Sequence, residues 1–222
     1  MDRELEIKKI IYALGFCNFE ELSEENFKEN VVDIFREKYH NSCRYDTGAT
    51  KGVLLFQNFN FVIKIPFSGR WCYTDEEGDY FEEFCGTNNG DWNYCNSEVD
   101  TFREAKKSGI AECFLELKEL ARIDNYPIYI QEYASEIYCN SDDSCSSHTE
   151  DDIKKVKEIC EDNYYECFNT NWLGDVLNYY GKKVCESLLE FLEFMGINDL
   201  HGANLGYINK RPVIIDYGDF YD

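Results

Sequence analysis

The sequence predicts an α+β protein, and three stretches of the chain carry that prediction. Among the first forty residues, apolar side chains such as Phe27 and Val31 recur at helical spacing. Two short apolar runs, 53–56 and 61–67, are separated by a turn, which is the pattern of a β-hairpin. Toward the C-terminus, an apolar stripe follows the period of an amphipathic helix over 172–195. Helices and strands therefore have to share a core.

The remaining elements follow from turn residues and from changes in composition. A helical extension occupies 1–42, and Gly109 is placed to end a later helix. A stretch rich in Gly, Asp, Asn and aromatic residues reads as a long insertion. In chain order, we expect a turn at 47–52, the hairpin at 53–67, the insertion at 69–97, a helix at 97–108, a strand at 128–133, a loop at 135–150, helices at 151–166 and 172–195, and a hairpin near 205–216.

Charge limits the partners of this chain. It carries 44 acidic and 22 basic residues, a formal net charge of −22. A field of that sign disfavours direct binding to nucleic acid and to anionic membranes. It is compatible with a basic protein partner. No apolar stretch approaches the length of a transmembrane helix, and no signal peptide is recognisable at the N-terminus, so we expect a cytoplasmic protein.

The eleven cysteines do not form a recognisable disulfide framework. Their number is odd, they are scattered, and no Cys-x-x-Cys occurs. Cys113, Cys160 and Cys185 lie in apolar patterns, where cysteine packs as a small hydrophobic residue. Cys139, Cys145 and His148 lie close together but lack the paired spacing of zinc ligands. We therefore expect reduced thiols.

Three polar residues near the C-terminus suggest a site for phosphoryl transfer. Asp199 is followed five residues later by Asn204, and Asp216 begins an Asp-Tyr-Gly sequence twelve residues beyond that. Kinases present a catalytic base and two metal ligands in this order. Mg²⁺ prefers hard oxygen ligands, so an amide and a carboxylate beside nucleotide phosphates are suitable donors.

Three upstream segments fit the same chemistry. The sequence Gly48-Ala49-Thr50-Lys51-Gly52-Val53 is a turn whose glycines let backbone N–H groups approach a phosphate. Lys64 has apolar residues on both sides in a half-buried strand, and a charged group in that position needs a partner. Glu98 is the preferred helical partner over Glu104, because Phe102 and Ala105 continue its face.

In this order, the segments resemble the protein-kinase-like superfamily over residues 47–218. The resemblance implies a two-lobe fold with a reduced, mostly helical C-terminal lobe. It divides the chain into an N-terminal helical extension (1–42), a kinase-like N-lobe with the 69–97 insertion (43–134) and a minimal C-lobe (135–222). The catalytic loop is similar to that of small-molecule kinases of the aminoglycoside and choline kinase type.

The resemblance also implies roles for individual residues, with ATP and Mg²⁺ as cofactors. Backbone groups of the hinge would meet the adenine at Glu132 and Ala134, and Asp199 would orient or deprotonate the acceptor hydroxyl. The other roles implied are phosphate binding by Gly48, Thr50, Gly52 and Lys64, an ion pair of Glu98 with Lys64, and metal binding by Asn204 and Asp216.

The sequence departs from protein kinases in two places. Ile197 and Asn198 replace the usual His-Arg pair, and His201 stands where protein kinases carry Lys. The sequence stops four residues after Gly218, so we do not expect a peptide-binding platform of the usual kind.

Three functions stay open on this basis. The first is a phosphotransferase with an unknown acceptor. The second is a weak or inactive kinase-like protein that binds a basic protein partner. The third is a nucleotidyl transferase that attaches AMP.

Overall fold

The computed structural model is α+β and consists of two units. It describes residues 3–19, 22–39, 43–48, 50–67, 71–74, 80–83, 94–123, 126–136, 150–160, 170–197 and 200–218. Unit 1 comprises Met1–Asn96 and Leu117–Tyr133, and unit 2 comprises Ser97–Glu116 and Ala134–Asp222. The mixed α+β class predicted from the sequence is confirmed.

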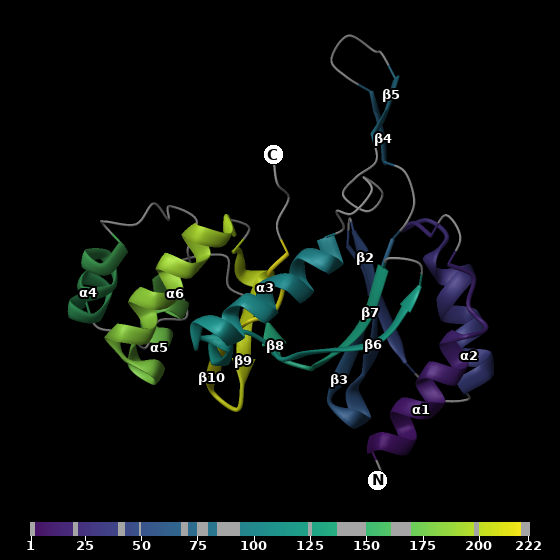
Figure 1. Cartoon of the computed structure of the whole chain (residues 1–222), viewed down its shortest axis with the longest axis horizontal. Helices are drawn as coiled ribbons and strands as arrows, with labels where there is room; N and C mark the ends of the chain where they lie inside the picture. Colours follow the sequence, from purple (N-terminus) through teal and green to yellow (C-terminus); the bar gives the residue numbers. More distant parts are fainter. Residues whose placement is uncertain are drawn as a thin grey trace. The chain divides into compact units, whose positions relative to one another are not determined.

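Unit 1 is built on a five-stranded antiparallel sheet with the strand order β1-β2-β3-β7-β6 (Figure 1). Its central strand, β3, pairs on one side with β2 and on the other with β7. A separate two-stranded sheet, β4–β5, lies within the predicted insertion. The strand bounds are Arg44–Thr47 (β1), Lys51–Phe56 (β2), Phe61–Pro66 (β3), Trp71–Thr74 (β4), Tyr80–Glu83 (β5), Leu117–Ile123 (β6) and Tyr126–Glu132 (β7).

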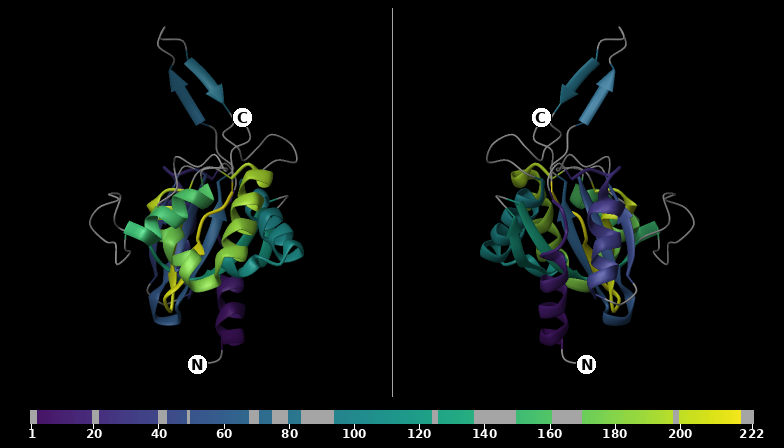
Figure 2. Two further views of the ribbon diagram at one scale, coloured as in Figure 1. Left: turned by 90° about the vertical axis from the view of Figure 1, so that its left-hand side faces the viewer. Right: turned by 90° about the vertical axis from the view of Figure 1, so that its right-hand side faces the viewer.

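The N-terminal helices cover one face of this sheet. Helix α1 (Arg3–Leu14) and helix α2 (Ile34–Tyr39) lie side by side against it, and a π-helical turn, η1 (Lys28–Asp33), leads into α2 (Figures 1 and 2). The sheet supplies the other half of this core, because every second residue of a strand points to the same face. The sheet residues in it are Leu54, Phe56, Phe61, Ile63, Ile65, Phe67, Ile128 and Ile130.

Phe27 joins the N-terminal segment to strand β2. Its ring is fully buried and lies against the ring of Phe67, with centroids 5.7 Å apart. A Cβ added to Gly52 would lie 2.3 Å from the nearest atom of the Phe27 ring. Only glycine fits at this point of β2 without displacing the ring.

Unit 2 combines helices with a small sheet. Helix α3 (Tyr94–Ser108) begins in unit 1 and continues into unit 2. Helices α4 (Glu150–Cys160), α5 (Thr170–Tyr180) and α6 (Lys182–Met195) pack in succession (Figure 2). The sheet has the order β10-β9-β8, with β8 at Ser135–Glu136, β9 at Leu205–Ile208 and β10 at Arg211–Ile214. Short 3₁₀ turns are η2 (Gln57–Phe59), η3 (Ala111–Cys113) and η4 (Gly202–Asn204).

A two-residue turn joins β9 to β10. Ile208 pairs with Arg211, so the turn consists of Asn209 and Lys210. Both have positive φ, 51° and 69°. This is the geometry of a type I′ turn, whose twist matches that of the strands it connects.

Most elements predicted from the sequence are present, with shifted ends. The hairpin of β2 and β3, helix α3 ending before Gly109, strand β7 and the β9–β10 hairpin are confirmed. Only part of the predicted helix over 151–166 falls within the described residues, as α4. Strands β1 and β6 were not predicted.

Two helical predictions were wrong in extent. The predicted helix 172–195 is two helices, because Gly181 has φ +87° and separates α5 from α6. The first forty residues are not one helical stretch either. Helix α1 ends at Leu14, and η1 begins only at Lys28.

Buried cysteines behave as the sequence predicted. Cys113 and Cys185 are free thiols with no exposed surface. Burial raises the pKa of the Cys113 thiol to about 12. The thiol therefore stays protonated at neutral pH and packs as an apolar group. The side chain of Cys160 lies outside the described residues, as do Cys139, Cys145 and His148.

Among the helices in the described ranges, none combines the length and apolar character needed to cross a membrane.

The contact between Phe27 and Gly52 predicts a difference between two glycines of one turn. We expect Gly52→Ala to lower the free energy of unfolding by about 1–3 kcal/mol, because the new methyl group overlaps the buried ring. Gly48→Ala is the matched control, since its Cβ would meet no atom closer than 3.9 Å. Urea denaturation of both variants measures the difference. Equal stability of the two would contradict the packing described here.

Candidate functional site

Lys64 occupies the middle of the sheet on the face opposite the N-terminal helices. Its neighbours along β3, Ile63 and Ile65, point into the helix-covered core, so Lys64 points the other way. In the sheet register it lies between Val53 and Tyr129. Its side chain is 4% exposed, and Nζ lies 5.9 Å from the centroid of the Tyr129 ring. A desolvated ammonium group is thus held over an aromatic face.

A second buried lysine shares this face. Lys51 precedes Val53 by two residues in β2, so strand alternation directs it to the same side of the sheet as Lys64. It is 5% exposed, and its Nζ lies 4.2 Å from the centroid of the Tyr94 ring. The sequence pattern predicted Lys51 only as part of a turn. Strand alternation, counted back two residues from Val53, would have predicted that Lys51 lies on the same face of the sheet as Lys64.

The predicted phosphate-binding turn is a tight connection between β1 and β2. Thr47 pairs with Gly52, and the N–H of Gly48 donates to the carbonyl of Lys51 at 2.9 Å. Thr50 is buried, and its carbonyl accepts a hydrogen bond from the N–H of Phe67 at 2.8 Å. Gly48 is exposed and lies at the start of the turn, whereas Gly52 lies inside a strand under the Phe27 ring. Packing alone accounts for the glycine at position 52.

The predicted hinge lies at the boundary between the units. Glu132 pairs with Phe61 of β3, and its side chain accepts a hydrogen bond from the Asn60 amide at 3.1 Å. On the other edge of β7, the ladder with β6 ends at the pair Gln131–Leu117. Glu132 therefore lies one residue past that ladder. Ala134, the other predicted hinge residue, is buried and is the first residue of unit 2 after the boundary.

Glu98 is the buried carboxylate of helix α3. It has no exposed surface, and Phe102 and Ala105 on the same face are also buried. Glu104, the alternative weighed from the sequence, is part-exposed and pairs with Lys107 at 2.6 Å. Glu98 belongs to unit 2 and Lys64 to unit 1. The ion pair between them stays a prediction.

The two predicted metal ligands meet at the base of the β9–β10 hairpin. Leu205 pairs with Ile214, so Asn204 and Ile215 are the next residues outward on the two strands. The carbonyl of Asn204 accepts hydrogen bonds from the N–H of Ile215 at 2.7 Å and from that of Asp216 at 3.4 Å. Twelve residues of separation in sequence thus become a direct backbone contact.

Tyr217 fixes the residue that follows Asp216. It has no exposed surface, and its hydroxyl donates to the carbonyl of Leu115 at 2.8 Å. Its ring meets that of Phe114 edge to face, with centroids 5.2 Å apart. It also lies 6.3 Å from the ring of Phe102, one turn beyond Glu98 on α3. Tyr217 therefore anchors the Asp-Tyr-Gly segment to the helix that carries Glu98.

The structure describes part of the predicted catalytic loop. Asp199, the predicted catalytic residue, lies outside the described residues together with Asn198. Ile197 and Leu200 on either side of this pair are buried. His201 is exposed, and its Nδ1 accepts a hydrogen bond from the N–H of Ala203 at 3.2 Å. It thus braces the turn η4.

Asn204 and Asp216 offer Mg²⁺ one amide and one carboxylate oxygen. Mg²⁺ keeps several waters and takes one or two carboxylates in nucleotide sites, so this donor set suits it. Within the described ranges, no group of three or more His, Cys, Asp and Glu side chains is gathered as a metal cage.

Comparison with known proteins gives no independent guide to function. No family model matches the chain, and neither a curated protein nor a solved structure matches it. Functional inference therefore depends on the chain's own residues.

The anchoring role of Tyr217 predicts that removing its hydroxyl oxygen destabilises the protein. We expect Tyr217→Phe to lower the free energy of unfolding by about 1–3 kcal/mol, because the buried carbonyl of Leu115 loses its donor. Tyr179→Phe is the matched control, since Tyr179 is 55% exposed. Chemical denaturation compares the two variants. If they were equally stable, the hydroxyl of Tyr217 would have no anchoring role.

Proposed function

We propose that this protein is an ATP- and Mg²⁺-dependent phosphotransferase with a kinase-like two-lobe fold. The contact between Asn204 and Asp216 is the observation that carries this proposal. The sequence suggested these residues as metal ligands from their spacing alone, and the hairpin register brings their backbones together. The hairpin would bring any residues at these positions together, and the support for the proposal is that both residues carry an oxygen donor suited to Mg²⁺.

Unit 1 supports the nucleotide-binding half of the proposal. Lys64 and Lys51 are buried ammonium groups on one face of the sheet. Lysine ammonium groups bind phosphates as point charges. Two cations on one face suit the phosphates of a nucleotide, with Lys64 on the α- and β-phosphates. The backbone of Glu132 and Ala134 would meet the adenine edge, and Gly48 and Thr50 would border the phosphates.

Unit 2 supports the chemical half. When bound, Mg²⁺ would neutralise charge on the transferred phosphoryl group. Asp199 would receive the proton of the acceptor hydroxyl as its oxygen attacks the γ-phosphorus and the bond to ADP breaks. Glu98 would orient Lys64, and Tyr217 would hold Asp216 in place. The acceptor is a hydroxyl compound of unknown identity.

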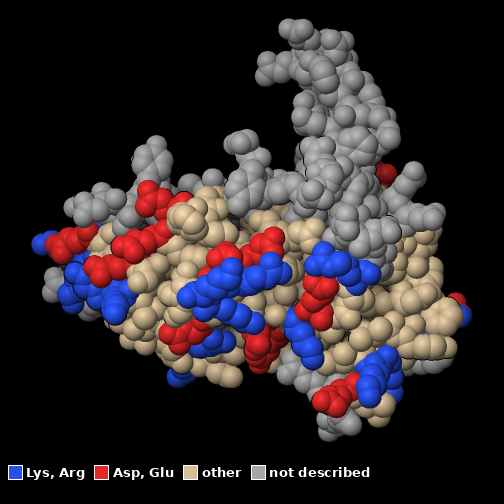
Figure 3. Space-filling model, viewed as in Figure 1, with Lys and Arg blue, Asp and Glu red and all other residues tan. Residues whose placement is uncertain are grey.

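Acidic and basic side chains are interspersed on the face of the protein that Figure 3 presents. On the side presented in Figure 3, Lys and Arg alternate with Asp and Glu, although the chain as a whole is strongly acidic. Several of these basic residues pair with neighbouring acids, as Arg103 does with Asp100 and Arg122 with Glu119.

The proposal predicts Mg²⁺-dependent stabilisation by ATP. At a hundredfold its Kd, a nucleotide raises the free energy of unfolding by about 2.7 kcal/mol, which is a shift of several degrees in Tm. We expect Lys64→Met and Asp216→Asn to abolish the shift. Lys118→Met is the matched control, because Lys118 is an exposed lysine in the same sheet. Thermal denaturation with and without ATP and Mg²⁺ gives the result.

Transfer itself is tested with ATP labelled in either the γ- or the α-phosphate. Incorporation of the γ-label that is lost in Asp199→Ala supports a phosphotransferase. Incorporation of the α-label would instead indicate a nucleotidyl transferase. Absence of any ATP-dependent shift in the wild-type protein at millimolar nucleotide would overturn the proposed function and favour a binding role.

A further inference from the structure

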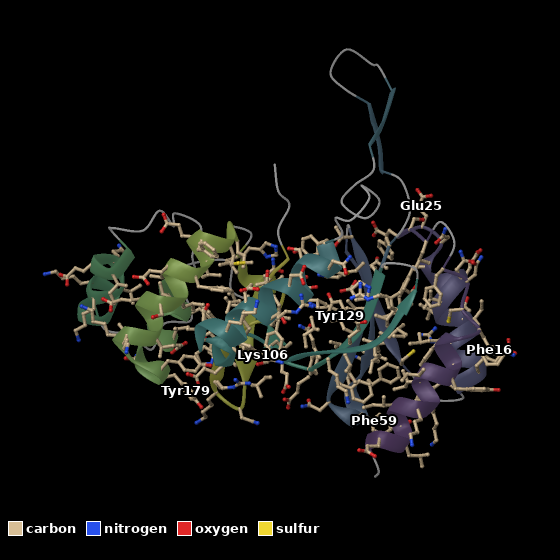
Figure 4. The ribbon with its side chains drawn as sticks, viewed as in Figure 1. Phe16, Glu25, Phe59, Lys106, Tyr129 and Tyr179 are labelled. Carbon is tan, nitrogen blue, oxygen red and sulfur yellow. The ribbon has the colours of Figure 1, made fainter. Side chains whose placement is uncertain are left out.

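Helix α1 presents an apolar stripe to solvent. Leu5 is 52% exposed, Tyr12 is 67% exposed and Phe16, just after the helix, is 46% exposed. With Lys9 between them, they follow the spacing i, i+4, i+7 and i+11, which places them on one side of a helix. The opposite side carries the buried core residues of α1. Figure 4 shows Phe16 on the side of α1 and α2 that faces away from the sheet.

A concavity beside this stripe is lined by basic and phenolic side chains. It has a volume of about 450 Å³ and lies between α1 and the end of α2. The lining residues are Lys8, Lys9, Tyr12, Lys38 and Tyr39. Every one of these side chains carries a hydrogen-bond donor, and none carries a carboxylate.

A buried carboxylate contacts two of the side chains that line this concavity. Glu6 is 4% exposed, and it accepts a hydrogen bond from the hydroxyl of Tyr39. Its other oxygen lies 3.3 Å from the Nζ of Lys9. Glu6 therefore ties α1 to the end of α2 and holds two of the five lining side chains.

Aromatic contacts organise the remainder. The Nζ of Lys38 lies 5.2 Å from the centroid of the Phe16 ring and pairs with Glu37 at 2.8 Å. The ring of Tyr12 meets that of Phe16 edge to face, with centroids 5.0 Å apart. The lysines and the exposed rings thus form one continuous surface.

The charge of this concavity differs from that of the whole chain. The chain has twice as many acidic as basic residues, yet three lysines line one small concavity. Two of them have an acidic neighbour, because Lys9 lies beside Glu6 and Lys38 pairs with Glu37, so these three lysines and two glutamates leave one net positive charge. At physiological ionic strength the Debye length is about 8 Å, so distant acids contribute little to the local potential.

We propose that this concavity binds a multiply phosphorylated group, either a free small molecule or the headgroup of a lipid. Three ammonium and two phenolic groups provide charge-assisted and neutral donors for several phosphate oxygens. The apolar stripe lies beside them and would enter the acyl boundary if the phosphates belonged to a lipid. The site lies wholly within unit 1 and is independent of the proposed phosphotransfer.

Two probes without ATP or Mg²⁺ test this site. Inositol hexakisphosphate in isothermal titration calorimetry represents the free ligand. Sedimentation with phosphatidylcholine vesicles containing phosphatidylinositol bisphosphate represents the lipid. We expect at least one probe to bind, and Lys8→Ala/Lys38→Ala to weaken that binding by about tenfold or more, since each lysine near an anionic surface contributes about 1 kcal/mol. Lys9 is left intact because it pairs with the buried Glu6.

The matched control is Lys106→Ala/Lys107→Ala. This pair removes the same charge from α3, and there too one lysine lies over a ring and one pairs with a glutamate. We expect it to leave binding unchanged within about twofold, because these lysines lie outside the concavity. Equal losses of binding in both double variants would show that the effect depends only on net charge. That result would overturn the proposed site. Failure of both probes to bind the wild-type protein at millimolar probe concentration would also overturn it.

The variant Leu5→Ser/Phe16→Ser distinguishes the two sources of phosphate. If the ligand is a lipid, this variant loses vesicle binding and still binds inositol hexakisphosphate. If the ligand is a free compound, binding of inositol hexakisphosphate is retained and vesicles give the wild-type protein no added affinity. Both outcomes support a phosphate site in this concavity.

Discussion

The covering of one sheet face by the N-terminal helices determines the role of the other residues in unit 1. A strand directs alternate side chains to opposite faces, so burying Ile63 and Ile65 under α1 and α2 commits Lys64 to the far side. A shift of β3 by one residue would exchange those roles and bury the lysine in the aromatic core. The Phe27 ring on Gly52 fits only one placement of β2. The same placement directs Lys51 and Lys64 to one face.

Unit 2 uses a different device to position its polar residues. Here a short hairpin, rather than a broad sheet, brings Asn204 to Asp216, and the aromatic ring of Tyr217 ties the segment to α3. Gly206 permits the close approach of β8, because a Cβ at that position would lie 2.5 Å from the carbonyl oxygen of Ser135. The residues proposed for metal binding thus belong to a small, tightly packed element. Each unit has its own core, and each positions its own predicted site residues.

Much of this arrangement could be predicted from the sequence, because it depends on local patterns. Apolar neighbours marked Lys64 as buried, and the face of α3 favoured Glu98 over Glu104. Strands β1 and β6 escaped prediction because charged residues, Arg44 and Asp46 in β1 and Lys118, Glu119 and Arg122 in β6, interrupt the alternation.

Other features depend on tertiary contacts or on backbone angles. The apolar residues keep their helical spacing on both sides of Gly181. The sequence pattern therefore does not reveal the positive φ of Gly181. Phe27 matches helical spacing in the sequence, and that spacing does not reveal that its ring packs on Gly52. Lys51 was read as a turn residue because the strand was expected to begin two residues later. Asp199 remains a prediction from its spacing alone.

The Asn209–Lys210 turn sets a strict limit on the length of the chain around the proposed metal site. Both residues adopt left-handed backbone angles, and the turn between Ile208 and Arg211 has no spare residue. Inserting or deleting one residue there would change the register of β9 against β10. Asn204 would then face a different residue from Ile215, and its backbone contact with Asp216 would be lost. The turn therefore does not tolerate a change in chain length if the two predicted metal ligands are to stay together.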